Sequence, residues 1–587
     1  MAELLEEQRE NWGSRPGFVL AAIGSAVGLG NLWRFPYEAY SNGGGAFLIP
    51  YAIAMVIVGV PMLILEFSLG HFTQRAAPEA YGHLRPSWRW LGWWPICMSL
   101  VIICYYSVVL AWAVNYLGYS FDLSWGEDAT KFFLSDHLGY SGKHWPLGAI
   151  RWHIVAALAV TWLGMYLCVF RGVRFVSKIV LWTVPLPWLM LLILVIRGLT
   201  LEGAVSGLEY YLEPRWELLA RPRVWQTAFG QVFFSMTLAF GVMITYASFL
   251  HRKSDINNNA LIVGLADLGT SFVAGLAVFS VVGFLALQTT AANAKLMSVD
   301  ASQLPAIQAA IDREVEAGLT AEKLKEMKVN EQNAARFGLT PAQLTGLQAG
   351  VKGGKLDLAR VNATPDKVIG AGGGLAFMTY PTALRLLPWA NFFAVIFFLA
   401  LILLGIDSAF SMLEAGLASI VDKTRWSRGK VLPVICVCGF LVGLIFCTRS
   451  GEPWLSTIDH YVNSYFGVLA IGLIECIALG WIFDLKRLRA HANERSDWKI
   501  GKWWEWNIKL VIPIILAVIM VWTLYYDLTG EGGEGDKFMF VKNGRAVWHN
   551  ILGAAIVLML PVLAVIIAFV GRSKLKAAVE RESENAG

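Results

Sequence analysis

Residues 24–31 (GSAVGLGN) interrupt an apolar stretch with three glycines and an asparagine. Glycine permits backbone conformations that break a helix, and it lets a ligand approach the main chain closely. A helix break at membrane depth exposes polar backbone groups, which are tolerated only where they line a cavity. The carbonyls of Gly24, Ala26 and Val27 could therefore hold cations, and the amides near Leu29 an anion. The alternative is a packing surface on which small residues let two helices touch.

A second polar interruption lies in the apolar stretch 223–249, where Ser235, Thr237 and Gly241 stand among aromatic and aliphatic residues. Two interrupted helices in corresponding positions are the best sequence pointer to a binding site at the midplane of an inverted-repeat transporter. The pair therefore favours a binding role for 24–31 over the packing alternative.

Carboxylates inside apolar stretches are candidates for function because they are costly there. Asp407 and Ser408 are adjacent hard oxygen ligands, suited to an alkali cation. The alternative is a carboxylate bonded to helix backbone or water. Asp267 has Ser271 one turn later on the same helix face. Its carboxyl group either binds a cation directly or stays protonated, and the sequence leaves both readings open.

Two further pairs suit a transport pathway. Tyr105 and Tyr106 lie in the middle of one apolar segment, and adjacent helical residues point about 100° apart, so we expect at most one to face a site. Arg34 and Asp459 each lie near the outer end of a segment, where they could pair across the mouth of a pathway. Such an exposed ion pair would be weak enough to open.

The elements that must position these residues are membrane helices. The chain has 587 residues, 56% of them hydrophobic and 16% charged, with a mean hydropathy of +0.54. The net charge of +5 gives no indication of nucleic-acid binding, because the basic residues sit in the loops of a membrane protein. We count twelve apolar segments, each about long enough to span a bilayer, at 15–38, 43–69, 94–119, 150–169, 176–197, 223–249, 258–288, 391–420, 431–448, 455–483, 507–526 and 547–571.

Lysine and arginine cluster after every even-numbered segment, and such residues favour the cytoplasmic side. We therefore predict a multi-pass protein of the plasma (inner) membrane with both termini in the cytoplasm. The predicted divisions are a cytoplasmic segment 1–14, helices 1–7 in 15–288 with a first repeat in 15–197, an extracellular loop with a helical insertion in 289–375, helices 8–12 in 376–571, and a cytoplasmic tail 572–587.

The chain resembles the neurotransmitter:sodium symporter family. The resemblance covers 9–571 except most of 289–365 and is carried by GSAVGLGNLWRFPYEAYSNGGGAFLIPY, CYYS, FGQVFFSMTLAFGVMITYAS, GGGLAFMTYP and LLGIDSAFSMLEA. It implies an all-α fold of twelve transmembrane helices. Those helices form a 5+5 inverted repeat in which helices 1 and 6 are interrupted.

The resemblance also implies roles for residues at matching positions. The first sodium site would use Ala26, Asn31, Ser235 and Asp267, and the second Gly24, Val27, Leu404, Asp407 and Ser408. The substrate pocket would be lined by Ser25, Ala26, Leu29, Gly30, Ile102, Tyr106, Phe234, Ser235, Thr237, Phe240, Ser408 and Met412. The outer gate would be Arg34 with Asp459, plus Tyr106 over Phe240, and the inner gate Arg9 with Asp422 beside Trp12.

Two positions refine the expected substrate and ions. Gly28 stands where the similar monoamine transporters carry an aspartate, which leaves room for a substrate carboxylate and implies an amino acid. Asp267 stands where the family usually has asparagine, beside the residues that surround chloride in chloride-coupled relatives. Those residues are Tyr51, Gln231, Ser235, this position and Ser271. A fixed carboxylate would compete with chloride for the same cationic field of the bound sodium, so we expect no chloride requirement.

We therefore predict a sodium-coupled symporter, with two sodium sites, that takes up a neutral amino acid across the bilayer by alternating access. We find no nucleophile–base or metal-ligand cluster typical of an enzyme. Two alternatives stay open: chloride-coupled uptake of another carboxylate-bearing zwitterion, and a non-transporting amino-acid sensor. The sequence does not indicate an oligomeric state.

Overall fold

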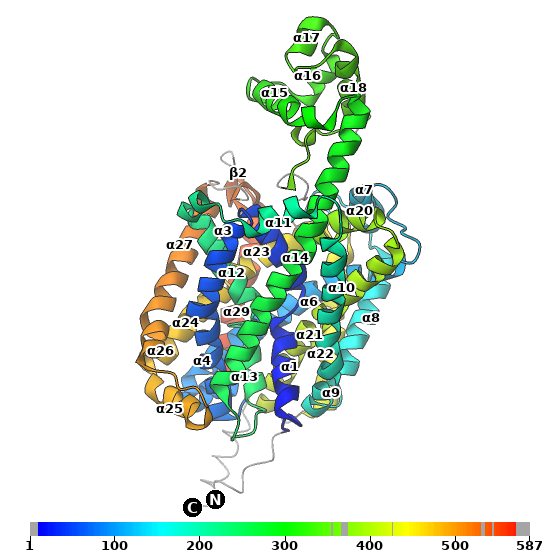
Figure 1. Cartoon of the computed structure of the whole chain (residues 1–587). Helices are drawn as coiled ribbons and strands as arrows, with labels where there is room; N and C mark the ends of the chain where they lie inside the picture. The colour runs from blue at the N-terminus through cyan, green and yellow to red at the C-terminus, as the bar shows by residue number, and fades with distance from the viewer. Residues whose placement is uncertain are drawn as a thin grey trace, which may run out of the picture.

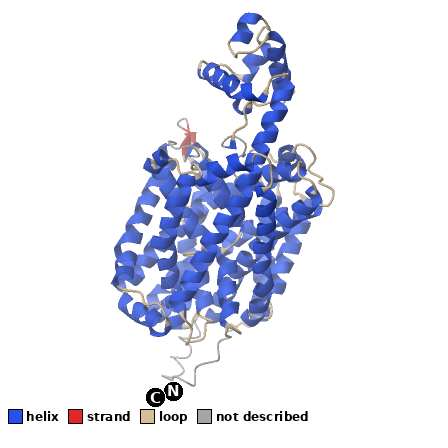
Figure 2. Ribbon diagram, in the orientation of Figure 1, coloured by secondary structure: helices blue, strands red, loops and turns tan. Residues whose placement is uncertain are grey.

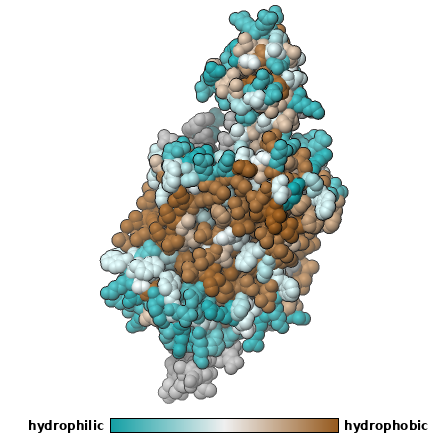
Figure 3. All heavy atoms as spheres, in the orientation of Figure 1, coloured by the Kyte–Doolittle hydropathy of each residue, from teal (hydrophilic) through white to brown (hydrophobic). Residues whose placement is uncertain are grey.

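The computed structural model describes residues 10–353, 356–365, 374–424, 426–529, 535–542 and 545–570. A bundle of long helices carries a slender helical projection at one end (Figure 1, Figure 2). We call that end the insertion end, and the opposite end, where α1 begins, the terminal end. Apolar side chains form a broad band around the middle of the visible face, with polar ones toward both ends (Figure 3). This is the surface that a bilayer requires, and the predicted all-α, membrane-spanning class is confirmed.

Each of the twelve predicted segments corresponds to a helix or a broken helix. In chain order they are α1 (Arg15–Ala26) with α2 (Phe35–Ser41); α3 (Gly45–Ala54) with α4 (Val60–Thr73); α6 (Arg89–Tyr119); α8 (Trp152–Val169); α9 (Val173–Thr183) with α10 (Pro185–Leu199); α12 (Pro222–Ser235) with α13 (Val242–Ala247); α14 (Ile256–Met297); α21 (Ala390–Lys423); α22 (Arg428–Gly443); α23 (Gly451–Asn463) with α24 (Val468–Ile477); α26 (Lys502–Trp506) with α27 (Ile512–Thr529); and α29 (Trp548–Phe569).

Within the described ranges, ten helical runs are long and apolar enough to cross a membrane, and the bent α1–α2 pair makes eleven. The remaining predicted segment is α12–α13. Its halves have 14 and 6 residues, so neither half spans a bilayer of ordinary thickness alone. The count of twelve spans therefore depends on treating this broken pair as one crossing.

The projection is a small helical unit with its own core. Its helices are α15 (Leu304–Glu316), α16 (Ala321–Glu326), α17 (Glu331–Ala335) and α18 (Pro341–Lys352). Leu304, Ile311 and Leu344 are buried in its core together with Met297 of α14. α14 continues without a break beyond the predicted helix end at 288 to Met297, so one helix runs from the bundle into the projection and anchors it.

Short elements connect the spans. They are α5 (Ala77–Leu84), α7 (Ala129–Lys131), α11 (Ala204–Leu212), α20 (Tyr380–Arg385), α25 (Leu485–Arg495), α28 (Gly535–Phe538), and the antiparallel strands β1 (Val541–Lys542) and β2 (Arg545–Ala546). In the bundle, α6 and α21 pack along each other, and α1 packs against α9, α14 and α21. This arrangement brings the interrupted α1 to the middle of the protein.

Candidate functional site

The break after α1 is held open by a side chain of its own segment. The chain bends by 44° between α1 and the helix that begins at Gly30. Val27 is extended there, with φ −87° and ψ 94°. The amide of Gly28 donates to Asn31 Oδ1 at 2.9 Å, so Asn31 satisfies a backbone group that the broken helix leaves free. The predicted interruption at 24–31 is present in the structure.

The break between α12 and α13 is a left-handed stretch of backbone. Thr237, Ala239 and Gly241 have φ of 54°, 63° and 70°. Non-glycine residues rarely adopt this conformation, and it persists only where the surroundings hold it. Here the buried Glu66 carboxylate accepts a hydrogen bond from the Ala239 amide at 2.7 Å. Glu66 therefore supports the second break from α4.

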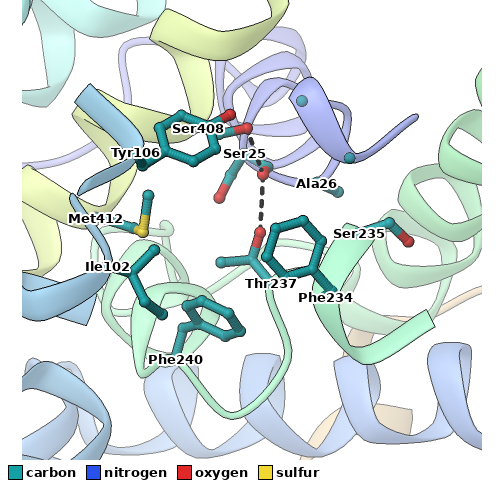
Figure 4. A pocket seen from close by; sticks show the side chains of 12 residues that line it. Ser25, Ala26, Ile102, Tyr106, Phe234, Ser235, Thr237, Phe240, Ser408 and Met412 are labelled. Atoms are coloured by element: carbon teal, nitrogen blue, oxygen red, sulfur yellow. Dashed lines mark hydrogen bonds between the residues drawn. The ribbon is translucent and has the colours of Figure 1, made fainter. Parts of the chain in front are cut away.

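The two breaks meet through the carbonyl oxygen of Ser25. This oxygen accepts from Thr237 Oγ1 at 2.8 Å and from Ser408 Oγ at 3.1 Å, as the dashed lines in Figure 4 show. One backbone oxygen of the first break is thus bonded to the second break and to α21. Three chain segments that are far apart in sequence are thus held together at one point: the two breaks and the middle of α21.

A small cavity lies at this junction. Its lining residues are Ser25, Ala26, Gly28, Gly30, Ile102, Tyr106, Phe234, Ser235, Thr237, Phe240, Ser408 and Met412. The structure thus brings together all but one of the side chains predicted to line the substrate pocket.

The exception is Leu29, and Gly28 lines the cavity instead. The Leu29 side chain is buried against Gly405 of α21. What Leu29 supplies near the cavity is its amide, which donates to Tyr106 Oη at 3.3 Å. The resemblance placed Leu29 at the pocket, but in the broken backbone its side chain packs on α21 instead.

The cavity is polar on one side and apolar on the other. Tyr106 Oη lies beside the glycine-rich break, whereas Ile102, Phe240 and Met412 form the far wall (Figure 4). No charged side chain lines this cavity among the described residues. The arrangement suits a small molecule whose charged groups face the broken helix and whose remainder is uncharged.

Asp267 lies in a cage of uncharged hydrogen-bond donors beside the first break. Its Oδ1 accepts from Asn31 Nδ2 at 2.7 Å, and its Oδ2 accepts from Ser235 Oγ at 3.0 Å and from Tyr51 Oη at 3.2 Å. Ser271 Oγ lies 2.8 Å from Asn31 Nδ2 and 3.0 Å from Tyr51 Oη. The structure thus gathers Asn31, Ser235 and Asp267, and Ala26 lies buried in the same segment as Asn31.

Two details of this cage differ from the predicted ligand sets. Asn31 turns its Nδ2 toward Asp267 and its Oδ1 toward the Gly28 amide, so its oxygen does not face the carboxylate. Gln231 donates to the carbonyl of Gly30 at 3.2 Å. Within the predicted chloride region, the Asp267 carboxylate itself takes the hydrogen bonds of the Tyr51 and Ser235 hydroxyls.

The predicted second sodium site lies where α1 ends against α21. Asp407 is buried, and its Oδ1 has no hydrogen-bond partner in the described structure. A buried carboxylate oxygen without a donor is the situation that a bound cation relieves. Ser408 Oγ donates to the Gly24 carbonyl at 3.2 Å. Val27 and Leu404 are buried in the adjoining break and one turn before Ser408, respectively.

The predicted outer gate is not paired in this structure. Arg34 lies near Glu38 at 3.5 Å and over the Phe234 ring at 4.5 Å. Asp459 accepts from Tyr105 Oη at 2.9 Å and from its own helix neighbour Asn463. Of the two adjacent tyrosines, Tyr105 thus binds the gate carboxylate, and Tyr106 faces the cavity, as predicted.

In the same way Tyr106 and Phe240 lie apart, on opposite sides of the cavity (Figure 4). Both contacts of the outer gate that the resemblance implies, Tyr106 over Phe240 and Arg34 with Asp459, are therefore absent between these described residues. The insertion end of the pathway is not closed by its predicted gate residues.

The terminal end is packed. Trp12 is buried, its Nε1 donates to the Tyr246 carbonyl at 3.0 Å, and the two rings are 5.1 Å apart. Asp422 Oδ2 accepts from the Ala76 amide at 2.9 Å. Arg9, the predicted partner of Asp422, lies outside the described residues. The described residues thus pack closely at the terminal end, whereas Arg34 and Asp459 do not contact each other at the insertion end.

One interruption was missed from the sequence. Residues 464–467 separate α23 from α24, directly after the turn that carries Asp459 and His460. Gly467 is the one local signal, since a Cβ there would lie 1.8 Å from the Val462 carbonyl oxygen. A single glycine in an apolar segment is too common to predict a break.

Comparison of the sequence with known proteins shows that its relatives are transporters. The profile described as "Sodium:neurotransmitter symporter family" matches residues 9–136 and 126–571. The chain is 34% identical over 545 residues to an uncharacterized sodium-dependent transporter of Methanocaldococcus jannaschii, covering 92% of this chain and 95% of the relative.

Two similar animal proteins have names that include their substrates. The sodium- and chloride-dependent taurine transporter of Rattus norvegicus is 29% identical over 564 residues, with 89% of this chain and 79% of the relative covered. The sodium- and chloride-dependent GABA transporter 2 of Homo sapiens is 30% identical over 517 residues, with 82% and 74% covered.

Proposed function

This chain belongs to the sodium:neurotransmitter symporter family, a family of transporters and not of enzymes, and we propose that it is a sodium-coupled symporter for a neutral amino acid. The observation that carries the proposal is the cavity where the two helix breaks meet. Its polar side offers backbone groups near Gly28 and Gly30, and its far wall is apolar and uncharged. A carboxylate at the broken helix and a neutral side chain at the far wall match those two surfaces.

Gly28 supports a substrate carboxylate on steric grounds. A Cβ at this position would lie 2.3 Å from Ser408 Oγ and 3.2 Å from Tyr106 Oη. Only glycine therefore leaves the space beside the Tyr106 hydroxyl free for a ligand oxygen. A substrate carboxylate held there lies next to the predicted first sodium site. Ion and substrate then stabilise each other's binding, which couples their transport.

We propose two sodium sites, with Asp267 and Asp407 as their carboxylates. Asp407 Oδ1 is buried and lacks a donor, which supports a cation beside it. Asp267 accepts only from uncharged groups, so its negative charge also favours a nearby cation.

We propose that chloride is not required. The Asp267 carboxylate accepts the Tyr51 and Ser235 hydrogen bonds that an anion in this region would need, and a second anion there would be repelled. The second candidate is chloride-coupled uptake, which is favoured by the names of the taurine and GABA relatives. The two candidates differ in one measurement, the effect of replacing external chloride by gluconate.

We further propose that the terminal end faces the cytoplasm, because the basic loops follow the even-numbered segments. Transport would then begin from an outward-facing state, with pairing of Arg34 and Asp459 closing the outer mouth. The opening of the Trp12 contacts would later release the cargo inside.

The test is uptake of labelled amino acids by purified protein in vesicles with an inward sodium gradient and in vesicles without sodium. Sodium-driven accumulation of one neutral amino acid, reduced by competition from its analogues, is the expected result. Binding without accumulation would instead identify a non-transporting sensor. Accumulation that needs no sodium gradient would contradict the proposal.

A further inference from the structure

A second cavity lies at the insertion end, away from the site described above. It has a volume of about 710 Å³ and is formed by the loop after residue 139, the start of α23, α28 and the first turns of α29. The side chains that matter here are Lys143, Lys537, Trp145, Trp548 and Leu552. None of the residues that line the substrate cavity lines this one.

The charge of this cavity favours an anion. Lys143 and Lys537 come from two different elements, and Glu452 is the one carboxylate among the described residues of its lining. Lys537 Nζ donates to Ser456 Oγ at 2.9 Å, which holds the ammonium at the cavity wall. Both lysines are exposed, so their charge is available to a ligand. The two lysines and one glutamate leave the cavity lining with a net charge of +1.

The other side of the cavity is continuous with the membrane surface of α29. Leu552 lines the cavity and is 51% exposed, and Met559 continues the same exposed apolar surface toward the middle of the helix. Trp145 and Trp548 flank the cavity with 71% and 74% exposure. Exposed tryptophans of this kind lie at the level of lipid headgroups. The cavity therefore joins a cationic pocket to a surface for acyl chains.

We propose that this cavity binds the headgroup of an anionic phospholipid. The two ammonium groups would contact its phosphodiester, and its acyl chains would lie along α29 from Leu552 onward. A headgroup with its own ammonium would leave the cavity's positive charge uncompensated, so a zwitterionic lipid fits less well. A free phosphate has the same chemistry at the lysines but makes no use of the apolar surface.

The site is connected to the helix that carries the predicted gate. His144 Nε2 lies 2.9 Å from Thr457 Oγ1, and Trp454 Nε1 donates to the His144 carbonyl at 2.8 Å. These contacts fasten the cavity loop to α23, which also carries Asp459. A lipid bridging the loop and α29 restrains α23, so it should change the rate of uptake.

The first experiment measures lipid binding and does not depend on the proposed function. Full-length protein in micelles is titrated with phosphatidylglycerol or phosphatidylcholine, and bound lipid is counted by native mass spectrometry. We expect phosphatidylglycerol to bind more tightly than phosphatidylcholine. The double variant Lys143→Ala/Lys537→Ala should bind it about 25-fold more weakly, at about fivefold for each lysine. The matched control is Lys328→Ala/Lys352→Ala, which removes two exposed lysines from the projection and should bind as wild type.

Three results would overturn the proposal: equal binding of both lipids, unchanged binding in the double variant, or an equal loss in the control variant. A third titration uses glycerol 3-phosphate, which has the phosphate without the chains. Competition by this compound at the concentration at which the lipid binds would identify a soluble-anion site and also overturn the lipid assignment.

The second experiment rests on the proposed function and measures sodium-driven uptake in vesicles of phosphatidylcholine with and without phosphatidylglycerol. We expect phosphatidylglycerol to change the uptake rate of wild type and of the control variant, but not that of the double variant. An equal response of all three proteins would contradict the link to α23. Absence of uptake in every vesicle would refute the proposed function while leaving the binding result intact.

Discussion

Replacing Asp267 with asparagine should convert chloride-independent uptake into uptake that needs chloride. The substitution keeps an oxygen for the 2.7 Å contact with Asn31 but removes the negative charge. It also takes away the carboxylate oxygen to which Tyr51 and Ser235 donate, at 3.2 and 3.0 Å. Two hydroxyl donors that had bonded the carboxylate are then available to an external anion.

The size of the effect follows from the interaction of two charges inside the protein. A carboxylate and a sodium ion about 4 Å apart attract by about 4 kcal/mol at an effective dielectric constant near 20. Since about 1.4 kcal/mol corresponds to a factor of ten, the loss weakens sodium binding by roughly a thousandfold. Chloride bound near Tyr51 and Ser235 would recover part of this interaction.

The assay is sodium-driven uptake in vesicles, measured as a sodium activation curve in chloride and in gluconate. The Asp267→Asn variant should need far more sodium in gluconate than in chloride, whereas wild type should give the same curve in both. Asp407→Asn is the matched control, because it removes a second buried carboxylate. The Asp407→Asn variant should need more sodium than wild type, by the same factor in chloride and in gluconate.

Two outcomes would refute this reasoning. One is a wild-type curve that collapses in gluconate, which would show that Asp267 does not replace chloride. The other is a folded Asp267→Asn protein whose sodium curve is unchanged in both anions, which would show that the carboxylate does not act on sodium at all.

Substitutions at three other positions should change substrate binding or the free energy of unfolding. Gly28→Ala places a Cβ 2.3 Å from Ser408 Oγ, so either Ser408 or the helix break must move by about 1 Å. A shift of this size should weaken substrate binding about a hundredfold. Unchanged binding of labelled substrate would contradict the close contact. Trp12→Ala should lower the free energy of unfolding by about 3–5 kcal/mol, whereas Trp12→Phe should lose about 1 kcal/mol with the hydrogen bond to Tyr246; equal thermal stability of the two variants in detergent would contradict this. Burial lowers the pKa of His137 from 6.5 to about 3, so the folded protein holds this imidazole neutral. The neutral imidazole contributes fully to stability above pH 6.5, and this contribution is lost as the pH falls toward 3. The loss should reach about 2 kcal/mol at pH 5 and be absent in His137→Phe; parallel pH trends in thermal unfolding would contradict it.

The fold was predictable because its signals are local. Apolar runs long enough to span a bilayer identify the membrane helices, and glycines inside such a run identify the break at Gly28. The break in α12–α13 also carried a signal, since Ser235 and Thr237 are polar residues in an apolar helix. The end of α14 was missed, because its last turns, up to Met297, are buried in the core of the projection and not in the bundle.

The cavity residues could be predicted from the resemblance at matching positions, and the structure gathers all of them except Leu29. Tyr106 faces the cavity and Tyr105 binds Asp459, as adjacent positions on one helix require. Leu29 was assigned to the pocket, but the broken backbone turns its side chain toward Gly405. The break before Gly467 had too little local signal to predict.

By itself the sequence determined the membrane class, the interruptions in 24–31 and 223–249, and the carboxylates inside apolar segments, because these depend on residue type and on spacing along one segment. Tertiary structure alone decided that the Ser25 carbonyl joins both breaks to Ser408, and that Asp267 takes the hydrogen bonds of Tyr51 and Ser235. Each of these contacts joins segments far apart in the chain. Their geometry is set by how whole helices pack, which no local pattern of residues records.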